Sequence, residues 1–420
     1  MKKFSYIDLF AGAGGLSEGF IANDFEHVAH IEKNTEACQT IKTRLSYHHL
    51  KEEGNLDFYN SYLKKEISQS DFYSKIPSEI LNSVICKEMH LDDFETLCTQ
   101  INASIVDVII GGPPCQAYSI VGRARQRDTE KKETDPRLFL YKIYGEFLKK
   151  FKPKLFVFEN VPGILSAKTV EGEKFIENIK AEFQALDYEM DFQTLNSAEF
   201  GVLQNRHRVI IIGWQKHLNL SYPDFSELKK SISEYTINND LFADLPKIQS
   251  SEKWDSVEYA APPTDYLRQS GLRTEKDLLT WHIARMNNEN DKEIYRLVHN
   301  EWFNKGKRTI YKNLPSHLIK QKNIKSFQNR FCVVEGDKSA SHTVVAHIAQ
   351  DGHYYIHPDL EQNRSITVRE AARLQSFPDN FYFEGSRTSA FSQIGNAVPP
   401  LFASAIAKAI KNILCQINKK

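Results

Sequence analysis

The stretch that most narrows the choice of fold is VDVIIGGPPCQ, residues 106–116. Its first five residues are apolar apart from Asp107, a pattern typical of a strand buried inside a parallel sheet. The two glycines and two prolines that follow forbid a helix and hold Cys115 at the carboxyl end of that strand. Because ligands bind at this edge of open α/β sheets, the rigid setting favours a nucleophilic Cys115 over an ordinary buried thiol.

Composition limits the class of protein. The chain has 420 residues, of which 41% are hydrophobic and 26% charged, as in a globular protein of two or three domains. Basic and acidic residues both number 54, so any surface for nucleic acid must be local. Six scattered cysteines without a Cys-x-x-Cys pair favour reduced thiols over disulfides or a zinc site. We expect a cytoplasmic protein with no metal and no membrane segment.

Strands and helices alternate through the first half of the chain. We expect strands at 4–10, 27–31, 83–86, 106–110, 154–158 and 208–213, and helices at 33–46, 138–151 and 171–186. This alternation predicts an α/β fold with a doubly wound, mostly parallel sheet whose polar residues gather at one edge.

A glycine turn follows the first strand. The turn AGAGG, residues 11–15, opens a helix, which lets backbone N–H groups approach a ligand at the helix N-terminus. Glu32 ends the second strand, where an acid suits ribose hydroxyls. A dinucleotide fingerprint needs glycine at position 17, and Ser17 therefore weakens the alternative of an NAD-dependent oxidoreductase. The pattern favours a ligand that contains adenosine.

The second half has a local basic region. From about residue 217 to 335 the alternation of strands and helices fails. Within 301–330, eight Lys and Arg residues accompany a single acid, with aromatic residues between them. This composition predicts a surface that faces nucleic acid.

Six motifs in order resemble those of the DNA (cytosine-5) methyltransferases of bacterial restriction-modification systems. They are DLFAGAGG at 8–15, PPCQ at 113–116, ENV at 159–161, QNRHR at 204–208, REAARLQSFPD at 369–379 and QIGNAVPP at 393–400. Leu203 replaces a proline found in many members. The resemblance implies a Rossmann-like fold that uses S-adenosylmethionine to methylate carbon 5 of cytosine in double-stranded DNA. It also implies a catalytic and cofactor-binding domain at 1–216, a smaller target-recognition domain at 217–365, and a segment at 366–420 that returns to the first domain.

The resemblance assigns roles to individual residues. Cys115 would add to carbon 6 of a flipped-out cytosine, Glu159 would bind its N3 and amine, and Arg206 its oxygen. Arg208 would hold Glu159 or a phosphate. The residues expected to bind the cofactor are Asp8, Phe10, Ala11, Gly12, Gly14, Gly15, Leu16, Glu32, Glu88, Pro114, Asn396 and Val398. The acid after the third strand stays open among Glu88, Asp92 and Asp93. The residues expected to bind DNA are Gln116, Ser119, Arg123, Arg125, Lys305, Lys307, Arg308, Lys320 and Lys322.

Two further alternatives stay open. A related enzyme could methylate tRNA, but the large region at 217–365 favours DNA. A silent DNA-binding regulator on this fold is disfavoured, because Cys115, Glu159, Arg206 and Arg208 are all intact. We expect a monomer on DNA, associated with the bacterial nucleoid, with any cognate restriction endonuclease acting separately.

Overall fold

The computed structural model describes residues 3–101, 103, 105–114, 140–169, 172–254 and 256–419. Five residues of the predicted site lie outside the described residues: Cys115, Gln116, Ser119, Arg123 and Arg125. Their roles stay predictions from the sequence.

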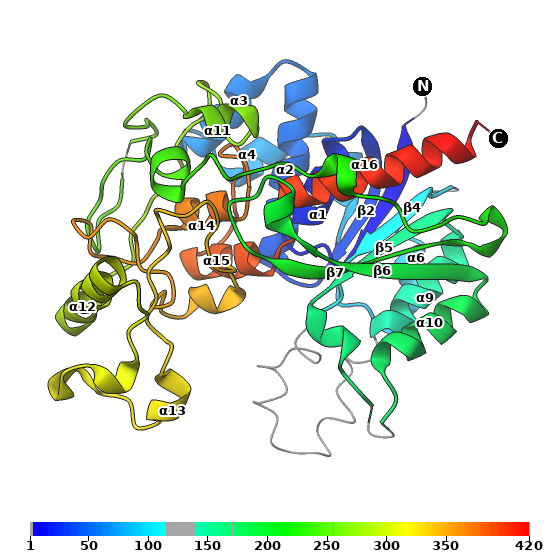
Figure 1. Cartoon of the computed structure of the whole chain (residues 1–420). Coiled ribbons are helices and arrows are strands. Elements are labelled where there is room, and N and C mark those ends of the chain that lie inside the picture. The colour runs from blue at the N-terminus through cyan, green and yellow to red at the C-terminus, as the bar shows by residue number, and fades with distance from the viewer. Residues whose placement is uncertain are drawn as a thin grey trace.

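A seven-stranded sheet forms the larger of two lobes, with the strand order β3-β2-β1-β4-β5-β7-β6 (Figure 1). The strands are β1 (Phe4–Leu9), β2 (Phe25–Glu32), β3 (Val84–Cys86), β4 (Val108–Gly111), β5 (Leu155–Asn160), β6 (Tyr188–Asn196) and β7 (His207–Gln215). Strands β1 to β5 pair in parallel, whereas β7 runs antiparallel to both β5 and β6. The predicted α/β fold with a mostly parallel sheet is confirmed.

Strand β6 was not predicted. It lies at one end of the strand order, and residues in its middle, such as Asp191, are exposed. An edge strand that is half exposed carries many polar side chains, and a sequence of that composition is easily taken for a loop.

The helices occur mostly where the first half predicts them. In that half they are α1 (Gly15–Ile21), α2 (Thr35–Glu52), α3 (Leu56–Leu63), α4 (Gln69–Tyr73), α5 (Ser78–Asn82), α6 (Phe94–Cys98), α9 (Leu140–Phe151) and α10 (Phe175–Ala185). The helices expected at 33–46, 138–151 and 171–186 correspond to α2, α9 and α10. Helices α3 to α5 were not predicted.

The two faces of the sheet are covered by different helices. On β4, Val108 and Ile110 pack on one side with apolar residues of α1 and of the last helix, α16 (Pro400–Ile417). Ile109 packs on the other side with α6, α9 and α10. All three side chains are fully buried. The continuous apolar run at 106–110 therefore reflects a strand with both faces covered.

The smaller lobe has few regular elements. Its helices are α11 (Asp265–Gln269), α12 (Glu289–Lys305) and α13 (Ile324–Phe327), joined by long irregular segments. The next helix, α14 (Val368–Leu374), shares an apolar core with this lobe. Arg373 of α14 donates to the carboxylates of Asp244 and Asp379, and all three side chains are fully buried. This charged network joins the smaller lobe to the C-terminal segment.

The chain returns to the sheet at its end. Helix α15 (Arg387–Asn396) leads into α16, which packs against α1. Asn23 donates to the Ser404 hydroxyl at 2.9 Å, and Lys411 to Asp24 at the same distance. Within the described residues, the run Arg387–Ile417 is the one helical stretch long and apolar enough to cross a membrane, and 56% of its most apolar window is buried inside the protein. This burial is that of a core helix.

Candidate active site

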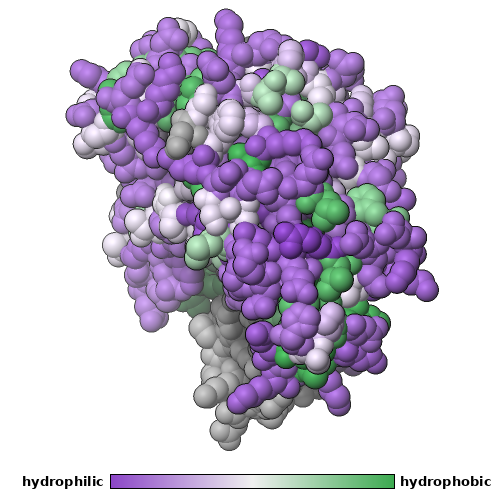
Figure 2. Space-filling view, turned by 90° about the vertical axis from the view of Figure 1, so that its left-hand side faces the viewer, coloured by the Kyte–Doolittle hydropathy of each residue, from purple (hydrophilic) through white to green (hydrophobic). Residues whose placement is uncertain are grey.

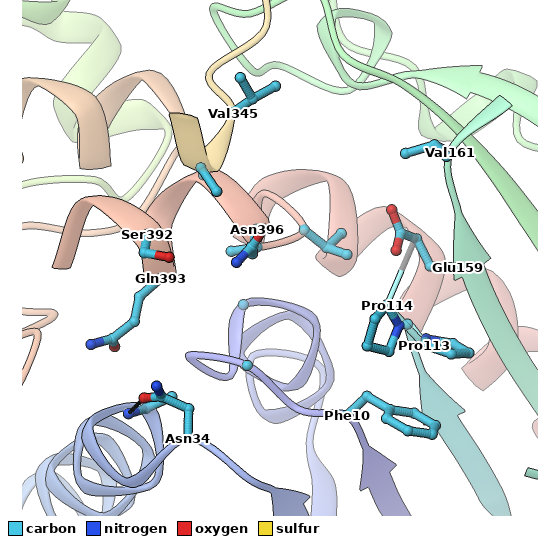
Figure 3. Close-up of a pocket in the computed structure, with 18 of the residues that line it drawn as sticks. Phe10, Asn34, Pro113, Pro114, Glu159, Val161, Val345, Ser392, Gln393 and Asn396 are labelled. Atoms are coloured by element: carbon cyan, nitrogen blue, oxygen red, sulfur yellow. Dashed lines mark hydrogen bonds between the residues drawn. The ribbon is translucent and has the colours of Figure 1, made fainter. Parts of the chain in front are cut away.

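A cavity of about 1670 Å³ runs along the carboxyl ends of β1, β2, β4 and β5 and is walled by residues of both lobes (Figure 3). Ordinary small-molecule pockets hold roughly 300–1,000 Å³. This cavity therefore has room for two ligands side by side. Its position agrees with the rule that open α/β sheets bind ligands at this edge.

The glycine turn forms the floor of the cavity. Gly12 has a φ of +55°, and an added Cβ there would meet no atom within 4 Å, so this backbone faces open space. The Gly12 N–H donates to Glu32 Oε2 at 2.9 Å, and the Asn34 N–H donates to Glu32 Oε1 at 2.8 Å. Each carboxylate oxygen keeps a further lone pair. Glu32 is thus fixed in place and can still accept hydroxyl groups from a ligand.

Asp8 lies beneath this turn with an unused polar atom. Its side chain is 1% exposed, and Oδ2 has no hydrogen-bond partner among the described residues. Burial, and next the nearby Glu32 carboxylate, raise the pKa of Asp8 well above its ordinary value. Since buried polar groups are normally paired, Asp8 indicates a ligand group at this point of the cavity.

Ser17 has a structural role of its own. Its hydroxyl lies 2.7 Å from His30 Nε2 and hydrogen-bonds the Tyr6 hydroxyl inside the core. Burial lowers the pKa of His30 well below its ordinary value, so the ring is held neutral. A glycine at position 17 would leave His30 and Tyr6 without this partner, which accounts for the departure from the dinucleotide fingerprint.

Two of the three acids after β3 line the cavity. They are Glu88 and Asp92, whereas Asp93 is paired with Lys87 at 2.6 Å and is not part of the wall. Glu88 pairs with Lys33 at 2.9 Å, which lowers the pKa of Glu88. The adenine contact stays a prediction, for which Glu88 and Asp92 are the two acids at the cavity wall.

The opposite end of the cavity carries the predicted catalytic carboxylate. Glu159 of β5 lies beside Pro113 and Pro114, as Figure 3 shows. Its Oε1 is 2.7 Å from Arg208 Nε, and both side chains are about one tenth exposed. A Cβ added to Gly112 would lie 2.8 Å from Glu159 Oε2. Glycine at position 112 therefore leaves the space that this carboxylate occupies.

Arg206 is held by backbone carbonyls at the junction of the lobes. It is 1% exposed, and its guanidinium donates to Val344 O at 2.7 Å and to Gly395 O at 3.3 Å. It also lines the cavity. These contacts assign Arg206 a part in joining the lobes, in addition to the contact with the base that the sequence predicts.

The C-terminal segment supplies the remaining wall next to the glycine turn. Asn396 and Val398 line the cavity, and Ser392 and Gln393 of α15 lie beside them (Figure 3). The Thr40 hydroxyl donates to Gln393 Oε1 at 2.7 Å, which ties α15 to α2. Of the residues predicted to bind the cofactor, all except Gly14 line the cavity.

Ser392 and Gln393 were not assigned to the site from the sequence, although Gln393 is the first residue of the QIGNAVPP motif and Ser392 precedes it. Their position in and next to this motif is the signal that could have identified them.

The basic residues of the smaller lobe that were predicted to bind DNA lie elsewhere. Lys305, Lys307, Arg308, Lys320 and Lys322 are exposed on the smaller lobe and do not line the cavity. Lys305 pairs with Glu301 at 2.9 Å. The smaller lobe instead lines the cavity with Lys325, Gln328, Asn329, Arg330, Val345, Ala346, His347, Gln350, Tyr354 and Tyr355.

Within the described ranges, no cluster of three or more His, Cys, Asp or Glu residues is arranged to hold a metal ion. The expectation that the reaction needs no metal stays a prediction.

A family profile and the related sequences place this chain in the same family. The sequence profile of the family described as C-5 cytosine-specific DNA methylase matches residues 4–72 and 48–412. The type II methyltransferase M.Bpa9945I of Bacillus paralicheniformis is 44% identical, over 97% of this chain and 98% of the relative. M.DdeI of Desulfomicrobium norvegicum is 32% identical, over 98% of this chain and 89% of the relative. These matches confirm the family that the six motifs predicted.

Solved structures agree on the fold. An E. coli prophage protein described as a candidate DNA modification methyltransferase superposes with a TM-score of 0.64 at 22% identity, over 98% of this chain and 100% of the other. S. pombe Dnmt2 methyltransferase superposes with a TM-score of 0.50 at 15% identity, over 99% of this chain and 100% of the other. At these identities the likeness establishes the fold alone.

Proposed function

Since the chain belongs to the C-5 cytosine-specific DNA methylase family and is a DNA methyltransferase, we propose that it methylates carbon 5 of a cytosine within one specific duplex sequence. The observation that carries this proposal is the placement of the Glu159–Arg208 pair in the same cavity as the Gly12 turn. One end of the cavity suits a cofactor, and the other suits a base.

S-adenosylmethionine fits the first end. Glu32 would accept the ribose hydroxyls, Glu88 or Asp92 would bind the adenine side, and the open backbone at Gly12 would lie against the ligand. Asp8 presents the unused polar atom described above, and Asn396 and Val398 would close the site. When bound, S-adenosylmethionine supplies an electrophilic methyl group to carbon 5 of the base.

The second end would hold a cytosine that has left the base stack. The Cys115 thiolate would add to carbon 6, and the electron pair displaced from the ring double bond would make carbon 5 a nucleophile. After carbon 5 carries the methyl group, a base removes its proton, the bond from sulfur to carbon 6 breaks, and the thiolate is released. Glu159, oriented by Arg208, would hydrogen-bond N3 and the amine and stabilise the charge on the ring.

The setting is inferred from the relatives. The named relatives are type II methyltransferases, so we infer that this chain is the modification enzyme of a type II restriction-modification system. We place it in the bacterial cytoplasm at the nucleoid, acting as a monomer, with any cognate endonuclease acting separately. Of the domain division proposed from the sequence, at 1–216, 217–365 and 366–420, the first boundary is supported by the end of β7 at Gln215.

The experiment is methyl transfer from tritiated S-adenosylmethionine to mixed-sequence duplex DNA, with unfractionated tRNA assayed in parallel. Cys115→Ala tests the nucleophile, and Cys86→Ala is the matched control, because Cys86 is exposed and lies outside the cavity wall. We expect 5-methylcytosine in DNA with the unaltered chain and with Cys86→Ala, and none with Cys115→Ala.

Two results would overturn the proposal. Label in tRNA alone would make the chain an RNA methyltransferase. Absence of label in both polymers, with cofactor and DNA still bound, would make it a silent DNA-binding regulator.

A further inference from the structure

The cavity wall opposite the predicted catalytic residues contains a short segment of the smaller lobe, residues 324–330. Lys325, Gln328, Asn329 and Arg330 line the cavity together with Glu159 and Arg208 of the sheet. Figure 1 shows α13, at the start of this segment, projecting from the smaller lobe beyond α12. A base held beside Glu159 would therefore occupy a cavity that this segment also lines.

The backbone of the segment is anchored on one side by aromatic packing. The Phe327 ring lies 5.1 Å from the Tyr311 ring, and Tyr311 is 2% exposed. The Tyr311 N–H donates to Gln328 O at 3.0 Å. The position of Gln328 is thus fixed by its own main chain and by the residue before it.

The other side is anchored by charge. Arg330 donates to Asp351 and hydrogen-bonds His347, and its guanidinium also lies 5.6 Å from the centre of the Phe327 ring. Asp351 has a lowered pKa in these surroundings, where Arg330 and His353 outweigh the effect of burial. Residues 327 and 330 are therefore both tied to the body of the lobe.

Between these anchors, the side chains of Gln328 and Asn329 line the cavity. Gln328 is half-buried, and its buried Oε1 has no hydrogen-bond partner among the described residues. Asn329 is exposed, so its amide is open to solvent and to a ligand. A fixed backbone lowers the entropy that such side chains lose when they bind.

The chemistry of an amide suits the edge of a base. A Gln or Asn side chain presents one donor and one acceptor in a plane, which matches N7 and N6 of adenine in the major groove. Lys325 offers only a point charge, which suits phosphate and carries no sequence information. The outer face of the lobe is mainly hydrophilic, with apolar side chains in small separate spots (Figure 2).

We propose that Gln328 and Asn329 read the base pairs next to the target cytosine, with Lys325 binding the backbone phosphate beside them. This inference rests on the proposed function and names specificity residues for it. They differ from the lysines at 305–322 that the sequence predicted to bind DNA.

The test measures sequence preference separately from rate. Duplexes with randomised positions around a central cytosine are methylated to a low extent and sequenced after bisulfite treatment. Gln328→Ala, Asn329→Ala and Lys325→Ala are compared with Gln321→Ala and Asn313→Ala, which alter exposed amides of the same lobe outside the cavity wall. Asn329→Asp keeps the size of the side chain and shows whether an effect of Asn329→Ala comes from lost recognition or from a folding defect.

We expect Gln328→Ala and Asn329→Ala to reduce discrimination at one or two flanking positions about tenfold or more. Lys325→Ala should slow the methylation of every sequence to the same extent and therefore leave the sequence preference unchanged. Asn329→Asp should shift preference toward a flanking cytosine, whose amine is a donor.

Unchanged preference in both alanine variants would overturn the inference while the unaltered chain still methylates DNA. An unaltered chain that methylates no cytosine in any duplex would instead overturn the proposed function.

Discussion

Arg208 Nε lies 2.7 Å from Glu159 Oε1, across the antiparallel pair of β7 and β5. In this register Glu159 of β5 pairs with Ile210 of β7, so Arg208 lies two residues along from that partner and on the same face of the sheet. The antiparallel insertion of β7 into an otherwise parallel sheet therefore brings the arginine to the carboxylate at the cavity.

Glu159→Gln should lower the rate of methyl transfer by roughly 100-fold or more, because the amide cannot share a proton with N3. Arg208→Lys should produce a smaller loss, since an ammonium group cannot reproduce the planar fork of the guanidinium. Single-turnover rates with saturating DNA measure both effects. Arg268→Lys, at an exposed ion pair with Asp265, is the control and should leave the rate unchanged. Full activity of Glu159→Gln would exclude the assigned role.

The two arginines of the QNRHR motif should differ in their effect on stability. Arg206→Met leaves the carbonyls of Val344 and Gly395 without a donor and should lower the free energy of unfolding by roughly 2 kcal/mol or more. Arg208→Met leaves Glu159, which is about one tenth exposed and lines the cavity, to hydrogen-bond water there instead, and should change that free energy less. Urea unfolding of the two variants, measured side by side, gives the comparison. Equal destabilisation would argue against the joining role of Arg206.

Gly12→Ala should weaken cofactor binding more than it weakens the fold. The new methyl group would project into the cavity from a backbone with φ of +55°. The strain costs about 1 kcal/mol, and we expect Kd for S-adenosylmethionine to rise about tenfold. Gly54→Ala is the matched control, since Gly54 has φ of +70° and equally open surroundings but lies outside the cavity wall. Calorimetric titration with S-adenosylmethionine should show a normal Kd for Gly54→Ala. An equal rise in both variants would trace the effect to backbone strain.

Stability should fall in mild acid, partly because of His282. Burial lowers the pKa of His282 to about 4. The ordinary value, near ~6.5, applies to the unfolded chain, which therefore binds more protons between pH 6.5 and 4. Protonation then favours unfolding, and the loss from this residue by pH 4 is on the order of 3 kcal/mol.

His282→Gln should make the decline shallower over that range. Glutamine does not titrate, and its amide can still donate to Pro246 O, which the His282 ring contacts at 2.8 Å. Urea midpoints at pH 7, 5.5 and 4.5 test this, with the exposed His217→Gln as control. A decline as steep as that of the unaltered chain would show that other groups dominate acid unfolding.

The sequence predicted those parts of the site that adjoin a strand end. Gly12, Glu32, Pro114 and Glu159 each follow or end an apolar strand, and neighbouring parallel strands bring such positions to one edge. All four line the cavity. Local pattern and sheet topology are enough to place them.

The wall from the smaller lobe could not be placed in this way. Gln328 and Val345 reach the cavity through irregular segments, and their positions depend on contacts such as Arg330 with Asp351 and Arg206 with Val344. No periodicity in the sequence reports these long-range contacts. The basic region at 301–330 led to the prediction of Lys305, Lys307, Arg308, Lys320 and Lys322, which lie outside the cavity wall, whereas Lys325 and Arg330 of the same region line it.

Helices α3 to α5 escaped prediction for a different reason. Each has eight residues or fewer, too short to be stable by propensity alone. They hold together through packing, of which the Tyr62 and Phe72 rings, stacked at 4.5 Å, are an example.

The packing of α16 against the sheet determines when the fold can be completed during translation. Strand β1 leaves the ribosome nearly 400 residues before α16, the helix that covers its Tyr6 face, and before Asn396 of the cavity wall. At roughly 5–20 residues per second, the interval amounts to tens of seconds. During that time an apolar face of the sheet lacks the helix that covers it in the folded protein. A chain translated only as far as α15 lacks Val398 of the cavity wall, so methyl transfer must wait until α16 has been made.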